Sequence, residues 1–179
     1  MSRAAGILMP ITSLPGKYGI GCFSKEAYAF IDWLKEAGQT YWQILPIHPT
    51  SYGDSPYQSF STFAGNPYFI DLEELIEEGM LTREECDSMD FGDDEDDIDY
   101  EDQYQNRYIL LTMAYERSNI SQNPDYQRFV EENRWWLDDY ALFMALKTFF
   151  NGQCWNKWPQ DIRLRWGYSM DYYRRELYF

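Results

Sequence analysis

The sequence predicts an α/β fold that begins with a strand, a helix and a second, parallel strand, followed by a mainly helical region. Two short apolar runs, residues 6–9 (GILM) and 41–45 (YWQIL), each end at a proline and predict strands. Between them, residues 25–38 carry apolar side chains at helical spacing. A strand, a helix and a strand within about 40 residues make a βαβ unit, which forms a parallel sheet with a right-handed crossover.

The first predicted strand consists of apolar residues only, so we expect it to be buried. Ser24 stands where the helix should begin and is a candidate N-cap. The capping box is only partial, because Ala27 occupies the position where glutamate would be ideal. Gly38 lies just past the predicted end of the helix, at the usual C-terminal stop. The apolar stripe of this helix comprises Ala27, Phe30, Ile31 and Leu34.

Beyond residue 72 the pattern is helical. A short helix stops at Gly79, and a second one starts at Thr82. The strongest helical pattern belongs to the segment 124–150, which stops at Asn151 and Gly152. Residues 154–165 predict a turn with two tryptophans. The later helical segments are 104–117, 124–150 and a last one that begins at residue 169.

The bulk composition excludes several classes of protein. The 179 residues include 15 Lys and Arg against 30 Asp and Glu, for a net charge of −15. The cations are scattered, whereas nucleic-acid binders carry a basic stripe, and an acidic surface is repelled by anionic membranes. No signal peptide and no apolar run of spanning length is present. We therefore expect a cytoplasmic protein that binds neither nucleic acid nor membrane.

The cysteines predict free thiols and no zinc site. They number three, lie far apart, and show no C-x-x-C spacing. An odd number without such spacing is typical of a reducing compartment. The three are Cys22, Cys86 and Cys154.

The predicted sheet poses a problem. Two parallel strands cannot form a stable sheet alone, because parallel sheets are covered on both faces. A barrel built from βαβ units usually needs about 250 residues. Two explanations stay open: further strands escape the pattern, or residues 1–179 are the front portion of a longer protein.

The loop after the second predicted strand, residues 51–72 (SYGDSPYQSFSTFAGNPYFIDL), contains six aromatic residues among amides, a carboxylate and turn residues. It should leave the carboxyl edge of the sheet, where ligand sites form in such folds. Sugars offer hydroxyl groups and flat C–H faces, so a sugar site combines rings with polar side chains. Gly53 and Pro56 would fix a turn here. Composition alone leaves two alternatives open, a sugar site and an ordered loop whose rings merely pack.

Four stretches, in this order and spacing, resemble the N-terminal part of the 4-alpha-glucanotransferase family. This is glycoside hydrolase family 77, whose members are also called amylomaltase or disproportionating enzyme. The resemblance covers essentially the whole chain. The stretches are ITSLPGKYGIG (11–21), YWQILPIHPTSYGDSPYQSFSTFAGNPYFIDL (41–72), WWLDDYALFMALK (135–147) and WNKWP (155–159).

The resemblance implies an incomplete (β/α)8 TIM barrel that carries a helical insertion. Residues 1–74 would be the start of the barrel, with its first βαβ part and the substrate loop. Residues 75–160 would form a mainly helical insertion subdomain, with an acidic flexible loop at 90–102. Residues 161–179 would be a helix that returns toward the barrel.

The resemblance also implies an activity, the transfer of alpha-1,4-glucan segments between maltooligosaccharides. The mechanism would be retaining, with a covalent glycosyl-enzyme formed by one carboxylate while a second carboxyl acts as acid and then base. In the family these groups lie on later barrel strands, so we expect no catalytic residue within residues 1–179, and these residues alone should be inactive. No cofactor or metal is implied. The alternative is a non-catalytic alpha-glucan-binding protein or a truncated inactive one.

What carries over by residue is substrate contact. Ser55, Pro56 and Tyr57 match the loop that lines the family's active-site groove near the cleavage point. We expect the Tyr57 ring to stack on a sugar or bond to it, with Asp54, Ser55 and Gln58 in support. Two further tyrosines match a secondary, non-catalytic glucan site, which is thought to guide long or curved glucans. These are Tyr52 and Tyr104.

Overall fold

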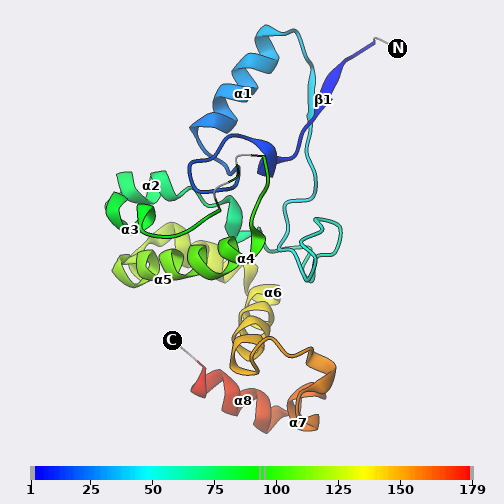
Figure 1. Cartoon of the computed structure of the whole chain (residues 1–179). Coiled ribbons are helices and arrows are strands. Elements are labelled where there is room, and N and C mark those ends of the chain that lie inside the picture. The colour runs from blue at the N-terminus through cyan, green and yellow to red at the C-terminus, as the bar shows by residue number, and fades with distance from the viewer. Residues whose placement is uncertain (1–2, 93, 95, 178–179) are drawn as a thin grey trace. The chain divides into compact units, whose positions relative to one another are not determined.

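The computed structural model describes residues 3–92, 94 and 96–177 of the chain (Figure 1). Contacts between residues divide it into two units, Met1–Ile120 and Ser121–Phe179. The predicted boundaries after residues 74 and 160 stay predictions. Positions 93 and 95 of the predicted acidic loop lie outside the described residues.

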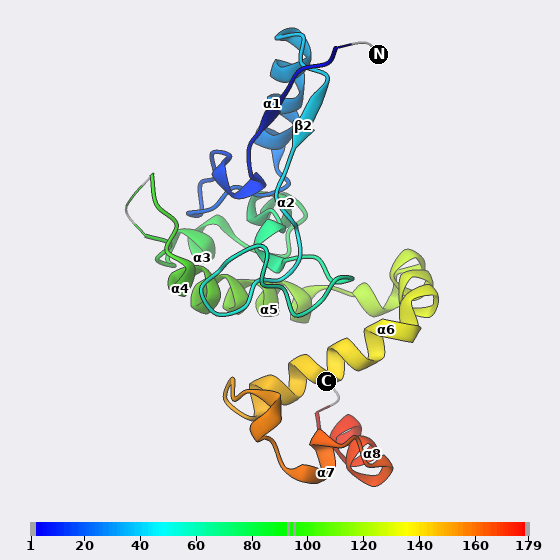
Figure 2. The ribbon, with the colours of Figure 1, turned by 90° about the vertical axis from the view of Figure 1, so that its right-hand side faces the viewer.

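The first unit begins with the predicted βαβ arrangement, formed by β1 (Gly6–Leu8), α1 (Lys25–Glu36) and β2 (Tyr41–Gln43). The strands pair in parallel, with Ile7 opposite Trp42. Helix α1 runs beside the strand pair (Figure 2). It packs on the pair through Phe30, whose ring centroid lies 4.9 Å from that of Trp42.

The expectation that the first strand is buried is wrong. Gly6 is exposed, and the Leu8 side chain is 58 % exposed. Tyr41 on β2 is 65 % exposed. The central residue of each strand is half-buried on one side of the pair, while its neighbours point to the other side, because side chains alternate across a strand. A run of apolar residues predicts burial on both faces, and two strands with one helix cover only one.

Both predicted ends of α1 are confirmed. Ser24 is the N-cap by position, with an extended backbone, but its side chain makes no capping hydrogen bond. Gly38 follows the last turn with φ of +69°. The core beneath the helix joins it to the loops on either side and consists of Ile11, Leu14, Ala27 and Phe69.

After the loop that follows β2, the first unit is mainly helical. Helix α3 begins with a full capping box, in which the Thr82 side chain accepts from the Glu85 backbone and the Glu85 side chain accepts from the Thr82 backbone. Helix α4 begins inside the predicted acidic loop, and Phe91 of that loop is buried. The elements are α2 (Leu72–Glu77), α3 (Arg83–Asp87), α4 (Tyr100–Asp102), a π-helical turn (Gln103–Arg107) and α5 (Tyr108–Arg117). Their buried core comprises Tyr18, Leu72, Leu81, Cys86, Phe91, Leu110 and Ala114.

The second unit contains the long helix α6 (Pro124–Phe149), α7 (Gln160–Arg163) and α8 (Gly167–Glu176). Asn123 caps α6 by accepting from two backbone N–H groups of its first turn. The segment predicted as a turn, 154–165, contains the short helix α7, which four residues are too few to reveal by periodicity. The buried core of the unit comprises Leu142, Leu146, Trp158, Ile162 and Met170. Short 3-10 segments lie at Ile11–Ser13, Pro67–Phe69, Ile120–Gln122 and Trp155–Lys157.

The cysteines are free thiols, as predicted: Cys22 and Cys86 are buried and Cys154 is exposed. Over the described ranges, no three His, Cys, Asp or Glu side chains gather in a way that could hold a metal ion. Among the helices the structure describes, none combines the length and apolar character needed to cross a membrane.

Candidate functional site

The loop that follows β2 is closed at its base and turns sharply at its tip. Thr50 and Ser59 form an isolated antiparallel bridge across the base. At the tip, Gly53 and Asp54 both have left-handed backbones, with φ of +85° and +53°. The Asp54 N–H donates to the Ser51 carbonyl oxygen at 3.1 Å, which closes the turn. The loop 51–58 is therefore an ordered turn with a fixed backbone.

The predicted groove residues lie together on this loop. The Tyr57 side chain is 73 % exposed, and Gln58 is exposed as well. Ser55 is half-buried and organises the turn beneath them. Its hydroxyl accepts from the Tyr57 N–H at 3.4 Å, and its carbonyl accepts from the Gln58 N–H at 3.0 Å. One turn thus leaves an aromatic ring and an amide exposed at neighbouring positions, and both are groups that can contact a polar ligand.

Asp54 differs from its neighbours because its carboxylate faces the protein. The Thr50 hydroxyl donates to Asp54 Oδ1 at 3.5 Å, and burial raises the pKa of this carboxyl. Burial is also the main reason that the pKa values of the Tyr68 and Tyr100 phenols are raised, and the charge of Asp54 raises both further. Asp54 thus lies within electrostatic reach of Tyr68, which follows it in the same loop, and of Tyr100 from a distant part of the chain.

These two tyrosines belong to a group of four, the tyrosine cluster, formed by Tyr68, Tyr100, Tyr104 and Tyr108. The Tyr68 ring centroid lies 6.2 Å from that of Tyr100 and 6.4 Å from that of Tyr108, and the Tyr104 and Tyr108 centroids are 5.3 Å apart. Tyr68 is buried, whereas Tyr104 is 63 % exposed. The cluster was not predicted as a unit. Three of its members recur every fourth residue, which is the sequence signal that could have revealed one face of a helix.

The two residues predicted for a secondary glucan site are both on the surface. Tyr52 is 87 % exposed and Tyr104 is 63 % exposed. Tyr52 lies two residues before Asp54 in the turn, and Tyr104 is the exposed edge of the tyrosine cluster that Asp54 faces. Their pairing in one glucan site stays a prediction.

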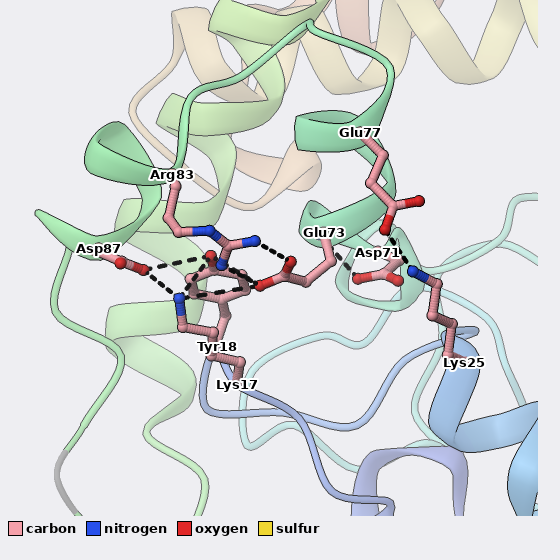
Figure 3. A network of polar contacts seen from close by, with 8 residues as sticks. All are labelled: Lys17, Tyr18, Lys25, Asp71, Glu73, Glu77, Arg83 and Asp87. Atoms are coloured by element: carbon pink, nitrogen blue, oxygen red, sulfur yellow. Dashed lines mark hydrogen bonds and ion pairs between the residues drawn. The ribbon is translucent and has the colours of Figure 1, made fainter.

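A network of ion pairs fastens the loop after β1 to α2 and α3 (Figure 3). Lys17 Nζ lies 2.7 Å from Asp87 Oδ1, and Arg83 makes two bonds to the Glu73 carboxylate, at 2.8 and 2.7 Å. The Tyr18 hydroxyl lies 3.3 Å from Glu73 Oε1 and 3.4 Å from Asp87 Oδ1. Burial and these carboxylates raise the pKa of Tyr18, so the phenol stays protonated at neutral pH.

A pocket of about 280 Å³ opens beside this network. Burial raises the pKa of Cys22, which lines the pocket, to about 11, so its thiol is protonated and a poor nucleophile. The charges that line the pocket are balanced, so it offers no field of one sign to a charged ligand. They are the cations Lys17, Lys25 and Arg107 and the carboxylates Glu26, Asp71 and Glu73.

Comparisons with known proteins show which family this chain matches. A family model described as 4-alpha-glucanotransferase matches residues 9–178. The 4-alpha-glucanotransferase of Clostridium butyricum is 50 % identical over 94 % of this chain and 35 % of its own length. That of Streptococcus pneumoniae is 46 % identical over 98 % of this chain and 35 % of its own length.

The solved structures give the same result. The amylomaltase of Streptococcus agalactiae, in complex with acarbose, superposes with a TM-score of 0.89 at 40 % identity. The match covers 98 % of this chain and 36 % of that one. The chain therefore spans about a third of the length of the proteins it matches.

Proposed function

Because the chain belongs to the 4-alpha-glucanotransferase family, glycoside hydrolase family 77, we propose that it is the N-terminal part of a 4-alpha-glucanotransferase. That enzyme transfers alpha-1,4-glucan segments from one maltooligosaccharide to another. The observation that carries the proposal is the family match across residues 9–178. The relatives' identities of 46 to 50 % support it over the alternative of a non-catalytic or inactive glucan-binding protein.

In this proposal the βαβ unit is the first part of a (β/α)8 barrel, residues 75–160 are a helical insertion, and residues 161–179 return toward the barrel. The loop 51–58 then lies at the carboxyl edge of the strands, where such barrels build their sites. The carboxylates for retaining transfer come from outside these 179 residues. A cytoplasmic location stays a prediction, as does the expectation that no nucleic acid or membrane is bound.

The chain's own contribution is to bind and orient the glucan. The Tyr57 ring stacks on a sugar face or bonds to a hydroxyl, and Gln58 donates and accepts hydrogen bonds beside it. Asp54 and Ser55 hold the turn in place from beneath. Because the substrate is neutral, shape, stacking and hydrogen bonds provide the binding free energy, and the net charge of −15 does not oppose it.

The test uses the full-length protein with maltotriose. The proposal requires glucose together with oligosaccharides longer than maltotriose, separated by anion-exchange chromatography. Tyr57→Ala should lower kcat/KM by about thirtyfold, or about 2 kcal/mol, as expected when a main contact is truncated. Tyr115→Ala, which removes an exposed ring from α5, is the matched control and should change little. Unchanged turnover in Tyr57→Ala would remove Tyr57 from the groove.

A further inference from the structure

The π-helical turn Gln103–Arg107 directs two polar side chains into the protein and an aromatic one out of it. Gln103 is fully buried, and Arg107 is 1 % exposed. Tyr104, between them in sequence, is 63 % exposed. Turns of this kind are rare and occur frequently at functional sites. The turn lies between α4 and α5 and so carries one edge of the tyrosine cluster.

The two buried side chains bind each other and two distant backbone carbonyls. Arg107 Nε donates to Gln103 Oε1 at 2.9 Å, and Arg107 Nη1 donates to the Ile70 carbonyl at 2.8 Å. Gln103 Nε2 donates to the Tyr18 carbonyl at 2.7 Å. Tyr18 belongs to the loop after β1, and Ile70 lies near the end of the loop 51–72 that follows β2. One turn thereby holds both loops that leave the strand pair.

The chain packs so closely around Gly19, next to Tyr18, that this position has no space for a side chain. A Cβ at this position would lie 2.8 Å from Gln103 Nε2 and 2.3 Å from the Phe91 carbonyl oxygen. The Arg107 guanidinium lies over the Phe91 ring, 5.9 Å from its centroid. Burial lowers the pKa of Arg107, although arginine stays charged in proteins.

A buried cation is a costly way to join two loops. Removing a charge from water is unfavourable unless its donors are satisfied, and an apolar residue would avoid that cost. An apolar residue, however, makes no directional hydrogen bonds. A guanidinium has donors in a fixed geometry and therefore fixes the position of each acceptor that it binds. The Gln103–Arg107 pair therefore specifies where the two loops lie relative to the turn.

We propose that Gln103 and Arg107 are positioning residues that hold Tyr104 at a fixed distance from the loop 51–58. This proposal rests on the proposed function, because Tyr104 and Tyr52 are its predicted secondary glucan site and Tyr57 its groove residue. With the pair intact, a long glucan can contact the exposed ring of Tyr104 and the groove at the same time. Without it, Tyr104 moves relative to the groove, and only long substrates lose a contact.

The test compares Arg107→Lys with Arg117→Lys in the full-length protein. Lysine keeps the charge at position 107 but cannot hold Gln103 and the Ile70 carbonyl together. Arg117 is an exposed arginine of the neighbouring helix α5, so the same substitution there is the matched control. We expect Arg107→Lys to lower kcat/KM for long amylose by about tenfold, mostly through KM, as a misplaced binding group would. Maltotriose turnover should fall much less, and Arg117→Lys should change neither.

A double variant separates positioning from a general loss of structure. If Arg107 acts through Tyr104, Arg107→Lys should cost nothing further on long amylose in a Tyr104→Ala background, because the two effects share one contact. Additive losses, or equal losses on amylose and maltotriose, would overturn the proposal. If Arg107→Lys does not fold, Gln103→Asn, which shortens the amide by one methylene, is subject to the same two criteria. A wild-type protein that transfers no glucan would instead overturn the proposed function, and this proposal with it.

Discussion

Gly19 and Gly38 share a left-handed backbone, with φ of +71° and +69°, but their surroundings differ. A Cβ at Gly19 would meet the Phe91 carbonyl oxygen at 2.3 Å, whereas a Cβ at Gly38 would meet no heavy atom within 4 Å. Gly38→Ala should therefore lower the free energy of unfolding by about 1 kcal/mol, the cost of the backbone conformation alone. Gly19→Ala should lower it by about 3 kcal/mol or more, because backbone must also move.

Urea denaturation of the full-length protein measures both glycine variants under one set of conditions. The comparison needs no separate control, because the two glycines have nearly the same φ and the cost of a left-handed alanine is therefore common to both variants. Equal losses would show that the loop at Gly19 can shift away from Gln103 at little cost. That result would also weaken the positioning role of Gln103 and Arg107, which requires a loop held in place.

The burial of Gln103 and Arg107 could not be predicted from the sequence. Arg107 lies in a segment with a helical pattern, where polar residues are expected to face solvent, and Gln103 directly precedes that segment. Their burial depends on carbonyl acceptors at Tyr18 and Ile70, which come from distant parts of the chain. No local pattern encodes such contacts. By contrast, Gly38 as a helix stop follows from local chemistry and is confirmed.

Among the elements, α3 is stabilised by the Glu85 carboxylate, which caps the start of the helix and pairs with Arg117 of α5. The Glu85 side chain accepts from the Thr82 N–H at 2.9 Å and from both terminal nitrogens of Arg117 at 2.7 Å. These bonds lower its pKa from 4.5 to about 2, with Arg117 as the main cause. Because the folded pKa lies below the unfolded one, the stabilisation is complete above pH 4.5 and is lost as the pH falls toward 2.

Glu85→Gln should therefore lower the melting temperature at pH 7, and the difference from wild type should shrink between pH 5 and pH 3. The amide can still accept from the Thr82 N–H, so the variant isolates the ion pair with Arg117. Melting curves recorded across this pH range give the answer, and Glu84→Gln, which removes a charge from the same turn of α3, is the matched control. A difference that stays constant with pH would mean that the Glu85 carboxylate gains nothing from Arg117.

Elements were predictable where local chemistry defines them. Helices α1 and α6 follow from apolar residues at helical spacing and from the predicted stops at Gly38 and Gly152, and the capping box of α3 begins at the predicted Thr82. Helix α7 was missed because it has only one turn. Strand positions were predicted but their burial was not, because burial depends on what covers a sheet and not on the strand itself.

For the whole molecule, the pattern of residues and the resemblance answer different questions. Periodicity predicts one βαβ unit and a helical region, and it leaves a two-stranded sheet without explanation. The resemblance of the loop 51–72 and three other stretches identifies the family, and the match over residues 9–178 confirms it. The position of Asp54 near Tyr100 of the tyrosine cluster follows from neither, since the two residues lie more than 40 positions apart in the sequence.

The most direct test of the central claim is transfer to a labelled acceptor. The full-length protein is incubated with maltoheptaose and glucose that carries ¹³C at every carbon, and the products are followed by mass spectrometry and NMR. A 4-alpha-glucanotransferase must place the label at the reducing end of a series of maltooligosaccharides joined by new alpha-1,4 bonds. Label that stays in free glucose, whether the maltoheptaose is hydrolysed or left intact, would contradict the assignment of this chain to a glucan-transferring enzyme.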